Sequence, residues 1–296
     1  GYAGLLDRRS RPFFGTEEVE MNHTESTFTG ADGMELFTQR WRPEGEPRAV
    51  VALVHGLGEH SGRYGNVVDT LVPAGFAIYT FDLRGHGRSP GQRGHIDRWE
   101  QYRGDVDAFL RHVAAEEPGR PLFLMGHSLG GLIVLEYVLH HPEGLEGVIA
   151  SAPGLSTEGL SPAAVLLSRI LSRIWPTFST STGLDATAIS CDPAVVAAYQ
   201  DDPLVHDKGT ARLGTEAAAA IKWTLSHASD LELPLLIIHG TGDRIVPYRA
   251  SQAFFEQVPA MNKEYHALDG VYHEAHNDVG WEGAVAIIED WIGRHR

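Results

Sequence analysis

The stretch that decides the fold of this chain is PLFLMGHSLGG, residues 121–131. An apolar run leads into a Gly-x-Ser-x-Gly turn at 126–130, and an apolar segment continues from there to His140. A strand that enters such a turn and leaves it as a helix is typical of a nucleophile elbow, in which the serine takes a strained backbone conformation. We therefore expect Ser128 to present its hydroxyl as a nucleophile. A glycine-rich turn with an exposed serine would share this pattern, so the other motifs must decide.

A serine hydroxyl becomes a useful nucleophile only when a base removes its proton. After a nucleophile elbow, an acid and then a histidine follow in chain order. Residues 235–239 form an apolar run that enters a turn ending at Asp243, and residues 264–268 form a shorter run before an Asp-Gly turn and His273. We expect Asp243 to orient the His273 imidazole, and His273 to deprotonate Ser128.

Each partner of the serine has a competing interpretation. An acid after a strand often only caps a turn or a helix, and Asp243 fits that description too. His276 and, more weakly, His266 compete with His273 for the role of base. His266 lies inside the shorter apolar run, where a structural role is favoured. His273 follows the turn at the end of that run, where a loop reaches the active edge of the sheet, and is the preferred base.

Attack on a carbonyl also requires hydrogen-bond donors for the oxyanion that forms. The backbone N–H of Leu129, directly after the serine, is one expected donor. The second should come from the loop after an earlier strand, and residues 49–54 form a strand-like run that ends in His-Gly-Leu-Gly. Gly56 and Gly58 allow that backbone to turn close to a substrate. We expect the N–H of Leu57 to be the second donor.

Four sequence blocks in the expected order carry a resemblance to a known family. They are HGLGEHSGRY at 55–64, DLRGHGRS at 82–89, GHSLGG at 126–131 and GVYHEAHN at 270–277. From about Thr27 to its C-terminus, the chain resembles an α/β-hydrolase of the monoacylglycerol lipase group. One departure is Asp278, which stands where the family pattern has Glu after the last block.

The resemblance implies a fold, an activity and a set of substrate-binding residues. The fold is an α/β-hydrolase fold with a mostly parallel central sheet, flanking helices and a helical cap inserted after the strand near Ser151. The activity is hydrolysis of monoacylglycerol to fatty acid and glycerol through an acyl-enzyme, with no metal or organic cofactor. Glu59, Arg63 and His276 would line a polar pocket for the glycerol head, and Tyr199 would face the same pocket.

A simpler interpretation of two of these residues remains open. Glu59 and Arg63 are four positions apart near a helix start, so they could form only a structural ion pair. The block at 82–89 is interpreted as mainly structural, with Gly85 and Gly87 setting a bend while Asp82 and Arg84 brace neighbouring loops.

Strand-like and helix-like segments alternate along most of the chain, which favours a parallel sheet covered on both faces. A hairpin at 26–41 precedes the strand-like runs, which lie at 50–55, 77–81, 122–125, 147–151 and 235–239. We expect residues 21–154 and 230–296 to form the core and residues 155–229 the cap. Residues 1–20 are expected to be an N-terminal extension, or a segment introduced for expression, ahead of a natural start at Met21.

The expected cap opens with an amphipathic helix beginning near Ser161 and Pro162. One face of this helix carries a stripe of large apolar side chains, namely Leu166, Leu167, Ile170, Leu171, Ile174 and Trp175. Such a stripe usually docks on the core of its own protein. In a lipase-like protein, it could instead line an acyl tunnel or make transient contact with a lipid interface.

The composition favours a soluble, cytoplasmic enzyme. The 24 basic and 39 acidic residues give a net charge of −15, which disfavours nucleic acids and anionic membranes as partners. Cys191 is the single cysteine, so no disulfide forms within the chain. The sequence has neither a metal-ligand pattern nor an apolar run of about 18 residues that would span a membrane.

Two other functions remain as alternatives. A lysophospholipase or a general carboxylesterase would use the same scaffold and the same triad. A non-catalytic binding protein of the same fold is less favoured, because Ser128, Asp243 and His273 are all present.

Overall fold

A single eight-stranded sheet forms the centre of the computed structural model, which describes residues 21–158 and 162–296. The strand order is β1-β2-β4-β3-β5-β6-β9-β10. The strands are β1 (Asn22–Thr29), β2 (Glu35–Arg42), β3 (Ala49–Val54), β4 (Phe76–Phe81), β5 (Leu122–His127), β6 (Gly147–Ser151), β9 (Leu235–Gly240) and β10 (Lys263–Leu268). Within this sheet of the described residues, antiparallel pairing is confined to β2, which pairs with β1 and with β4. The expected α/β-hydrolase architecture and hairpin are therefore confirmed.

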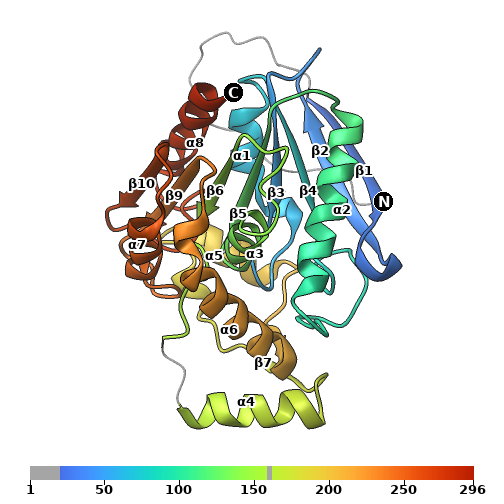
Figure 1. Cartoon of the computed structure of the whole chain (residues 1–296), viewed down its shortest axis with the longest axis vertical. Coiled ribbons are helices and arrows are strands. Elements are labelled where there is room, and N and C mark those ends of the chain that lie inside the picture. Colours follow the sequence, from blue (N-terminus) through green and yellow to red (C-terminus); the bar gives the residue numbers. More distant parts are fainter. Residues whose placement is uncertain (1–20, 159–161) are drawn as a thin grey trace.

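Helices cover both faces of this sheet, as Figure 1 shows. They are α1 (Gly65–Leu71), α2 (Glu100–Glu116), α3 (Leu129–Val138), α7 (Tyr248–Gln257) and α8 (Trp281–His295). Side chains of β3 alternate between the two resulting cores. Val50, Ala52 and Val54 join the core under α2 and α3, whereas the intervening residues join the core under α1 and α8. Burial on both faces explains why the strand is an uninterrupted apolar run.

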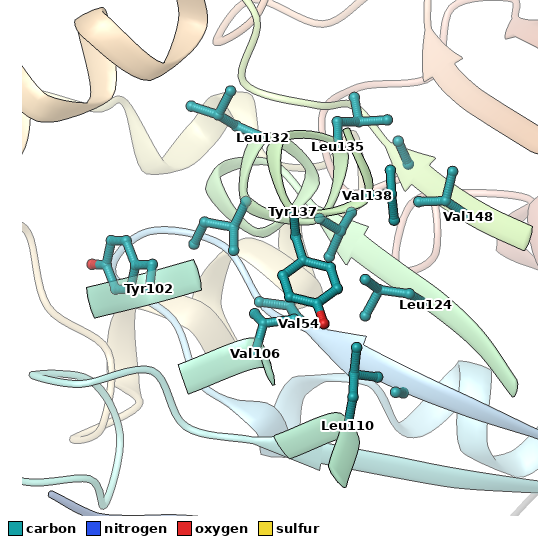
Figure 2. Packing of buried hydrophobic residues seen from close by; sticks show 14 of the residues in the cluster. Val54, Tyr102, Val106, Leu110, Leu124, Leu132, Leu135, Tyr137, Val138 and Val148 are labelled. Carbon is teal, nitrogen blue, oxygen red and sulfur yellow. The ribbon is translucent and has the colours of Figure 1, made fainter. Parts of the chain in front are cut away.

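The core under α2 and α3 is shown close up in Figure 2. Val138 projects from α3 toward Val148 of β6, whereas Leu132 and Leu135 project from the other side of the helix, away from Leu124 of β5. Helix α3 is buried along its whole length and is therefore held firmly against β5. The start of α3, directly after Ser128, is fixed by this packing.

The parallel register brings several loops to one edge of the sheet. Gly126 of β5 pairs with Val54 of β3 and with Ala150 of β6, so these strands end side by side. His239 of β9 pairs with Ala267 of β10 near their carboxyl ends. The loops that follow these five strands therefore meet above one edge, the usual place for a site in an open α/β sheet.

The segment between β6 and β9 forms a separate layer over that edge. Its elements are α4 (Pro162–Ile174), β7 (Ser179–Ser181), η3 (Ala186–Ala188), α5 (Pro193–Asp201), β8 (Lys208–Thr210), α6 (Ala211–Ser226) and η4 (Ala228–Asp230). Figure 1 shows α4 at one end of the molecule, with α6 between it and the sheet. We propose that residues 155–229 act as a cap; Ser161, expected near the start of α4, lies outside the described residues.

The apolar stripe of α4 faces solvent instead of docking on the core. Leu166, Leu167 and Ile174 are 59%, 56% and 74% exposed. The opposite face of α4 packs on α6, where the Ser172 hydroxyl lies 2.8 Å from that of Thr215. Docking on the core is therefore the wrong interpretation, since small polar residues of the helix make the intramolecular contact. Among helices formed by the described residues, none has the length and hydropathy needed to cross a membrane.

Candidate active site

Ser128 has the strained backbone that a nucleophile elbow requires. Its φ of 54° and ψ of −116° lie in a region that L-residues rarely adopt. Such a conformation costs about 1–3 kcal/mol and persists only where neighbours enforce it. The Ser128 N–H donates to the carbonyl of Ser151 at 3.0 Å, and its carbonyl accepts from the N–H of Gly154 at 2.9 Å. Hydrogen bonds to the last residue of β6 and to the loop after it therefore hold the turn between β5 and α3.

The two glycines of the elbow are required by close packing. A Cβ on Gly126 would lie 2.3 Å from the carbonyl oxygen of Gly130. A Cβ on Gly130 would lie 2.1 Å from the carbonyl oxygen of Val54. Both distances are far below van der Waals contact, so a side chain at either position would separate the strands from α3.

Asp243 and His273 meet above the ends of β9 and β10. The Nδ1–H of His273 donates to Oδ2 of Asp243 at 2.7 Å. The other oxygen, Oδ1, accepts from the N–H groups of Ile245 and Val246 at 2.8 and 2.9 Å. The carboxylate is fully buried and its direction is fixed by these bonds. The capping interpretation of Asp243 thus also describes the structure, because the same carboxylate caps its turn and contacts the histidine.

The electrostatics of this pair favour a charged carboxylate beside a basic imidazole. Burial alone would raise the pKa of Asp243, but the nearby His273 charge and hydrogen bonds from His239, His273 and the Val246 amide hold that pKa well below its ordinary value. Burial alone would lower the pKa of His273, but the charge and hydrogen bond of Asp243 raise it. This coupling suits a base that becomes cationic during turnover.

The other two candidate histidines do not contact Asp243 in the structure. His266 lies on β10, with its Nε2 3.4 Å from a Glu264 oxygen. His276 is 1% exposed and stacks on Tyr64 with ring centroids 4.7 Å apart. Burial lowers the pKa of His276 to about 4, so its ring is neutral at physiological pH. Of the three candidates, His273 alone has the geometry of a base oriented by this acid.

A cavity joins the predicted nucleophile and base. Ser128 and His273 both line it, beneath residues of the layer between β6 and β9. Its lining residues are Gly56, Leu57, Glu59, His127, Ser128, Leu184, Asp185, Ala186, Ile189, Tyr199, Ile245, His273 and Glu274. The wall combines carboxylates and a phenol with aliphatic side chains, which suits a substrate with a polar and an apolar part.

The two expected oxyanion donors lie beside the serine. Leu57 lines the cavity, and Leu129 is the first residue of α3, where helix amides lack an intrahelical acceptor. Within the described part of the chain, the N–H groups of Leu57 and Leu129 have no hydrogen-bond acceptor. Gly58, at φ +80°, lets the loop pass the carbonyl of His206, which a Cβ would approach to 2.4 Å. We propose Leu57 and Leu129 as the oxyanion donors.

Of the four expected glycerol-binding residues, two line the cavity and two lie behind its wall. Glu59 lines the cavity, but its Oε1 already accepts from the Gly56 N–H at 2.5 Å and from the Tyr64 hydroxyl at 2.9 Å. Arg63 stands outside the cavity lining, with Nε 3.3 Å from Oε2 of Glu59 and a second nitrogen 2.5 Å from Oε2 of Glu274. The ion-pair interpretation of Glu59 and Arg63 therefore describes this structure.

Arg63 and His276 accordingly differ from their expected placement. The Arg63 guanidinium lies over the ring of Tyr199 at 4.6 Å, and Tyr199 itself reaches the cavity as expected. His276 is enclosed between Tyr64 and His127. Neither Arg63 nor His276 lines the cavity; packing of the loop after β10 places both one layer behind it.

Sequence reasoning missed Glu274, and the structure gives Asp278 a definite role. Glu274 lines the cavity and binds Arg63, and its position next to His273 was the available signal. Asp278 is buried and accepts from the Ser190 hydroxyl at 2.7 Å and from the N–H groups of Cys191 and Tyr272, both at 2.6 Å. Asp278 thereby joins the His273 loop to the segment before α5.

The DLRGHGRS block braces the loop above β3, as predicted. Asp82 accepts from the N–H groups of Ser61 and Arg88 at 2.8 and 2.7 Å. Arg84 binds Asp105 of α2 through two nitrogens, each 2.7 Å from a carboxylate oxygen. The block therefore supports the site without lining the cavity.

Known proteins resemble this chain over most of its length. A family model described as serine aminopeptidase, S33 (Hydrolase_4), matches residues 45–280. A monoacylglycerol lipase of Mycolicibacterium smegmatis is 33% identical over 279 residues, which cover 94% of this chain and 99% of that protein.

Two solved structures share the fold. The monoacylglycerol lipase of Paleococcus ferrophilus is 38% identical, with a TM-score of 0.81 over 89% of this chain and 100% of the other. A soluble variant of the monoglyceride lipase of Saccharomyces cerevisiae, in complex with a substrate analog, is 25% identical. Its TM-score is 0.79 over 97% of this chain and 99% of that one.

Proposed function

Because this chain belongs to the Hydrolase_4 family of α/β-hydrolases, we propose that it is a serine ester hydrolase that cleaves monoacylglycerol to fatty acid and glycerol. The family description names a peptidase, whereas the relatives reported above are lipases, and both reactions pass through an acyl-serine. The observation that carries the proposal is the strained Ser128 in one cavity with His273, which is itself bound to Asp243.

The first half of the proposed reaction forms the acyl-enzyme. Ser128 Oγ attacks the ester carbonyl while Nε2 of His273 takes its proton, and Asp243 stabilises the imidazolium. The carbonyl oxygen becomes an oxyanion and accepts hydrogen bonds from the N–H groups of Leu57 and Leu129. The α3 dipole adds to the stabilisation, since its positive end lies at Leu129. The ester C–O bond then breaks, and glycerol leaves with the proton from His273.

The second half returns the enzyme to its starting state. Water enters, His273 removes one of its protons, and the resulting hydroxide attacks the acyl carbonyl. The same two amides hold the second oxyanion. Its collapse breaks the bond to Ser128, which recovers its proton from His273, and the fatty acid is released. The two half-reactions use the Ser128, His273 and Asp243 side chains, the two backbone amides and one water molecule.

The lining of the cavity supports a substrate with one polar and one apolar end. Glu59, Glu274 and Tyr199 supply oxygens that can hydrogen-bond glycerol hydroxyls. Leu184, Ile189 and Ile245 supply apolar surface for the start of an acyl chain. In this proposal Arg63 positions the carboxylates of Glu59 and Glu274. His276 packs behind the cavity wall, against His127.

The exposed stripe of α4 supports transient contact with a lipid surface. Leu166, Leu167, Ile170, Ile174 and Trp175 present an apolar face that residues 21–158 and 162–296 leave exposed. The net charge of −15 opposes electrostatic docking on anionic lipid, so the contact would be apolar and reversible. We further propose that the enzyme works in the cytoplasm, from which it reaches such surfaces.

The test measures fatty-acid release from monoacylglycerol against matched di- and triacylglycerols, lysophospholipids and short-chain esters, with Ser128→Ala as control. We expect the monoester to be strongly preferred and its hydrolysis to be lost in the variant. Equal or better activity on lysophospholipids or simple esters would keep the triad and replace the substrate with one of the alternatives. Failure of the wild type to react with a fluorophosphonate would favour a non-catalytic binding protein.

A further inference from the structure

A second histidine binds the acid of the proposed triad. His239, at the end of β9, is buried and its Nε2 lies 3.0 Å from Oδ2 of Asp243. The same oxygen accepts from Nδ1 of His273 at 2.7 Å. Two imidazoles, one from the end of β9 and one from the loop after β10, therefore converge on one carboxylate oxygen. The proposed mechanism uses only the second of them.

The surroundings of His239 fix where its hydrogen lies. Nε2 faces two acceptors, Oδ2 of Asp243 and the carbonyl of Val246, each at 3.0 Å. A bare ring nitrogen between two acceptors would be repelled by both, so Nε2 carries hydrogen. On the other side, Nδ1 lies 2.7 Å from the hydroxyl of Ser251, which either donates to it or accepts from it. Both arrangements leave an N–H directed at Asp243.

This N–H completes the hydrogen bonding of a buried carboxylate. Oδ1 of Asp243 accepts two backbone N–H groups, from Ile245 and Val246. Oδ2 accepts the two imidazoles, so each oxygen has two donors. Without His239, one acceptor position of a buried anion would be empty, and the carboxylate could rotate away from His273.

We propose that His239 is a positioning residue of the active site, which holds Asp243 in the orientation that directs Oδ2 to His273. The proposal rests on the function proposed above. His239 acts only through Asp243, since it lies outside the lining of the cavity. In the sequence His-Gly-Thr-Gly-Asp at 239–243, the donor His239 and the acid Asp243 lie on either side of the turn that follows β9.

The role has an electrostatic consequence at His273. The positive end of the His239 N–H dipole offsets part of the Asp243 charge. Removal of this N–H would therefore strengthen the attraction between Asp243 and protonated His273, and so raise the pKa of His273. The acidic groups around His273 are Asp243, Glu274 and Glu59, and all of them raise its pKa.

The ring of His127 packs against that of His273, with centroids 4.8 Å apart, and the ring of His276 packs against His127. Neither contacts His239 or is changed in the variants below, so their influence is constant across the comparison. Loss of the His239 donor should therefore move the acidic limb of the activity profile to higher pH.

The test compares two amides at position 239. In His239→Gln, the amide nitrogen reaches the place of Nε2 and can donate to Asp243. In His239→Asn, the nitrogen reaches only the place of Nδ1, beside Ser251. Tyr265→Phe is the matched control, because it removes a hydroxyl 3.0 Å from Ser251 and leaves the ring in place. For each enzyme, kcat and KM for monoacylglycerol are measured across pH. The concentration of active sites is determined by titration with a fluorophosphonate, and Tm is measured in parallel.

We expect the Asn variant to lose about tenfold or more in kcat at unchanged KM, as fits one hydrogen bond to a charged group. Its acidic limb should shift upward by about half a pH unit or more. The His239→Gln variant should keep most of the wild-type kcat and most of the wild-type position of the acidic limb. The Tyr265→Phe variant should match the wild type in both. Equal profiles for all four enzymes, or equal loss in Gln and Asn that follows Tm alone, would overturn the proposal.

The outcome is separable from that of the proposed function. An active wild type with an inactive Ser128→Ala and an unshifted His239→Asn would overturn only the role of His239. Full activity in Ser128→Ala would overturn the proposed function itself.

Discussion

At the residue scale, the site depends on buried groups whose charges are set by their neighbours. Asp243 is kept ionised by four donors. The pKa of His273 is raised mainly by Asp243, and further by Glu274 and Glu59. Activity requires His273 in its neutral form, because only that form can accept the serine proton. A raised pKa therefore moves the onset of activity to higher pH.

The acidic limb of kcat/KM should lie above pH 6.5, the ordinary imidazole value, since this limb reports the base of the free enzyme. Asp243→Asn removes the charge that raises the pKa of His273. We expect the limb to move to lower pH and kcat to fall by about 10³–10⁴-fold. The measurement is the pH profile of fatty-acid release for both enzymes. An acidic limb that stays in place in the Asn variant would contradict this coupling.

At the element scale, the contact between β5, β3 and α3 determines whether the elbow can form. Gly130→Ala would drive a Cβ into the backbone of Val54, which cannot move without disturbing β3. We expect a large fall in Tm and loss of active enzyme. Gly293→Ala in α8 is the matched control, since a Cβ there meets nothing within 4 Å.

The Gly293→Ala control should keep its activity, and its unfolding free energy should rise by up to about 1 kcal/mol because alanine has the higher helix propensity. Thermal unfolding and fluorophosphonate labelling of both variants give the comparison. A Gly130→Ala enzyme as stable as the wild type would show that the strand and the helix have room to separate.

A second prediction at this scale concerns the link through Asp278 between the His273 loop and the segment before α5. Asp278→Ala leaves the N–H groups of Cys191 and Tyr272 and the Ser190 hydroxyl without their acceptor. We expect a loss of about 1–3 kcal/mol in unfolding free energy. Asp278→Glu, which restores the residue of the family pattern, should recover part of it. Denaturant unfolding measures both, and an unchanged stability in the Ala variant would refute the link.

At the scale of the whole molecule, the uncovered face of α4 predicts behaviour that differs between dispersed and membrane-bound substrates. Leu167→Ser with Ile174→Ser should reduce binding to phosphatidylcholine vesicles and slow hydrolysis of monoacylglycerol held in them. Hydrolysis of a water-soluble short-chain ester should be unchanged. Met261→Ser, 98% exposed elsewhere on the surface, is the control. Equal vesicle binding by all three proteins would argue against lipid contact through α4.

The sequence predicted what depends on local pattern. The elbow at Ser128 follows from glycine spacing between an apolar strand and a helix, and the mostly parallel sheet follows from uninterrupted apolar runs such as β3. The place of His273 after a strand favours it over His276 and His266, and its contact with Asp243 agrees with that prediction.

Other features depend on the direction of side chains in three dimensions. An amphipathic pattern gives the same stripe whether α4 docks on a core or faces solvent, so the exposure of Leu167 could not be read from it. The family pattern predicts Arg63 and His276 in the cavity, but the packing of Tyr64, Glu274 and Tyr199 puts them behind it. The contact of His239 with Asp243 likewise needs the turn after β9 to be seen in space.

The most direct test of the whole account is fatty-acid release from monoacylglycerol by the wild type and by Ser128→Ala, both shown to be folded by thermal unfolding. The account predicts that the variant loses at least about a thousandfold in kcat, because the remaining oxyanion donors cannot replace the nucleophile. A folded Ser128→Ala that releases fatty acid at the wild-type rate would contradict it.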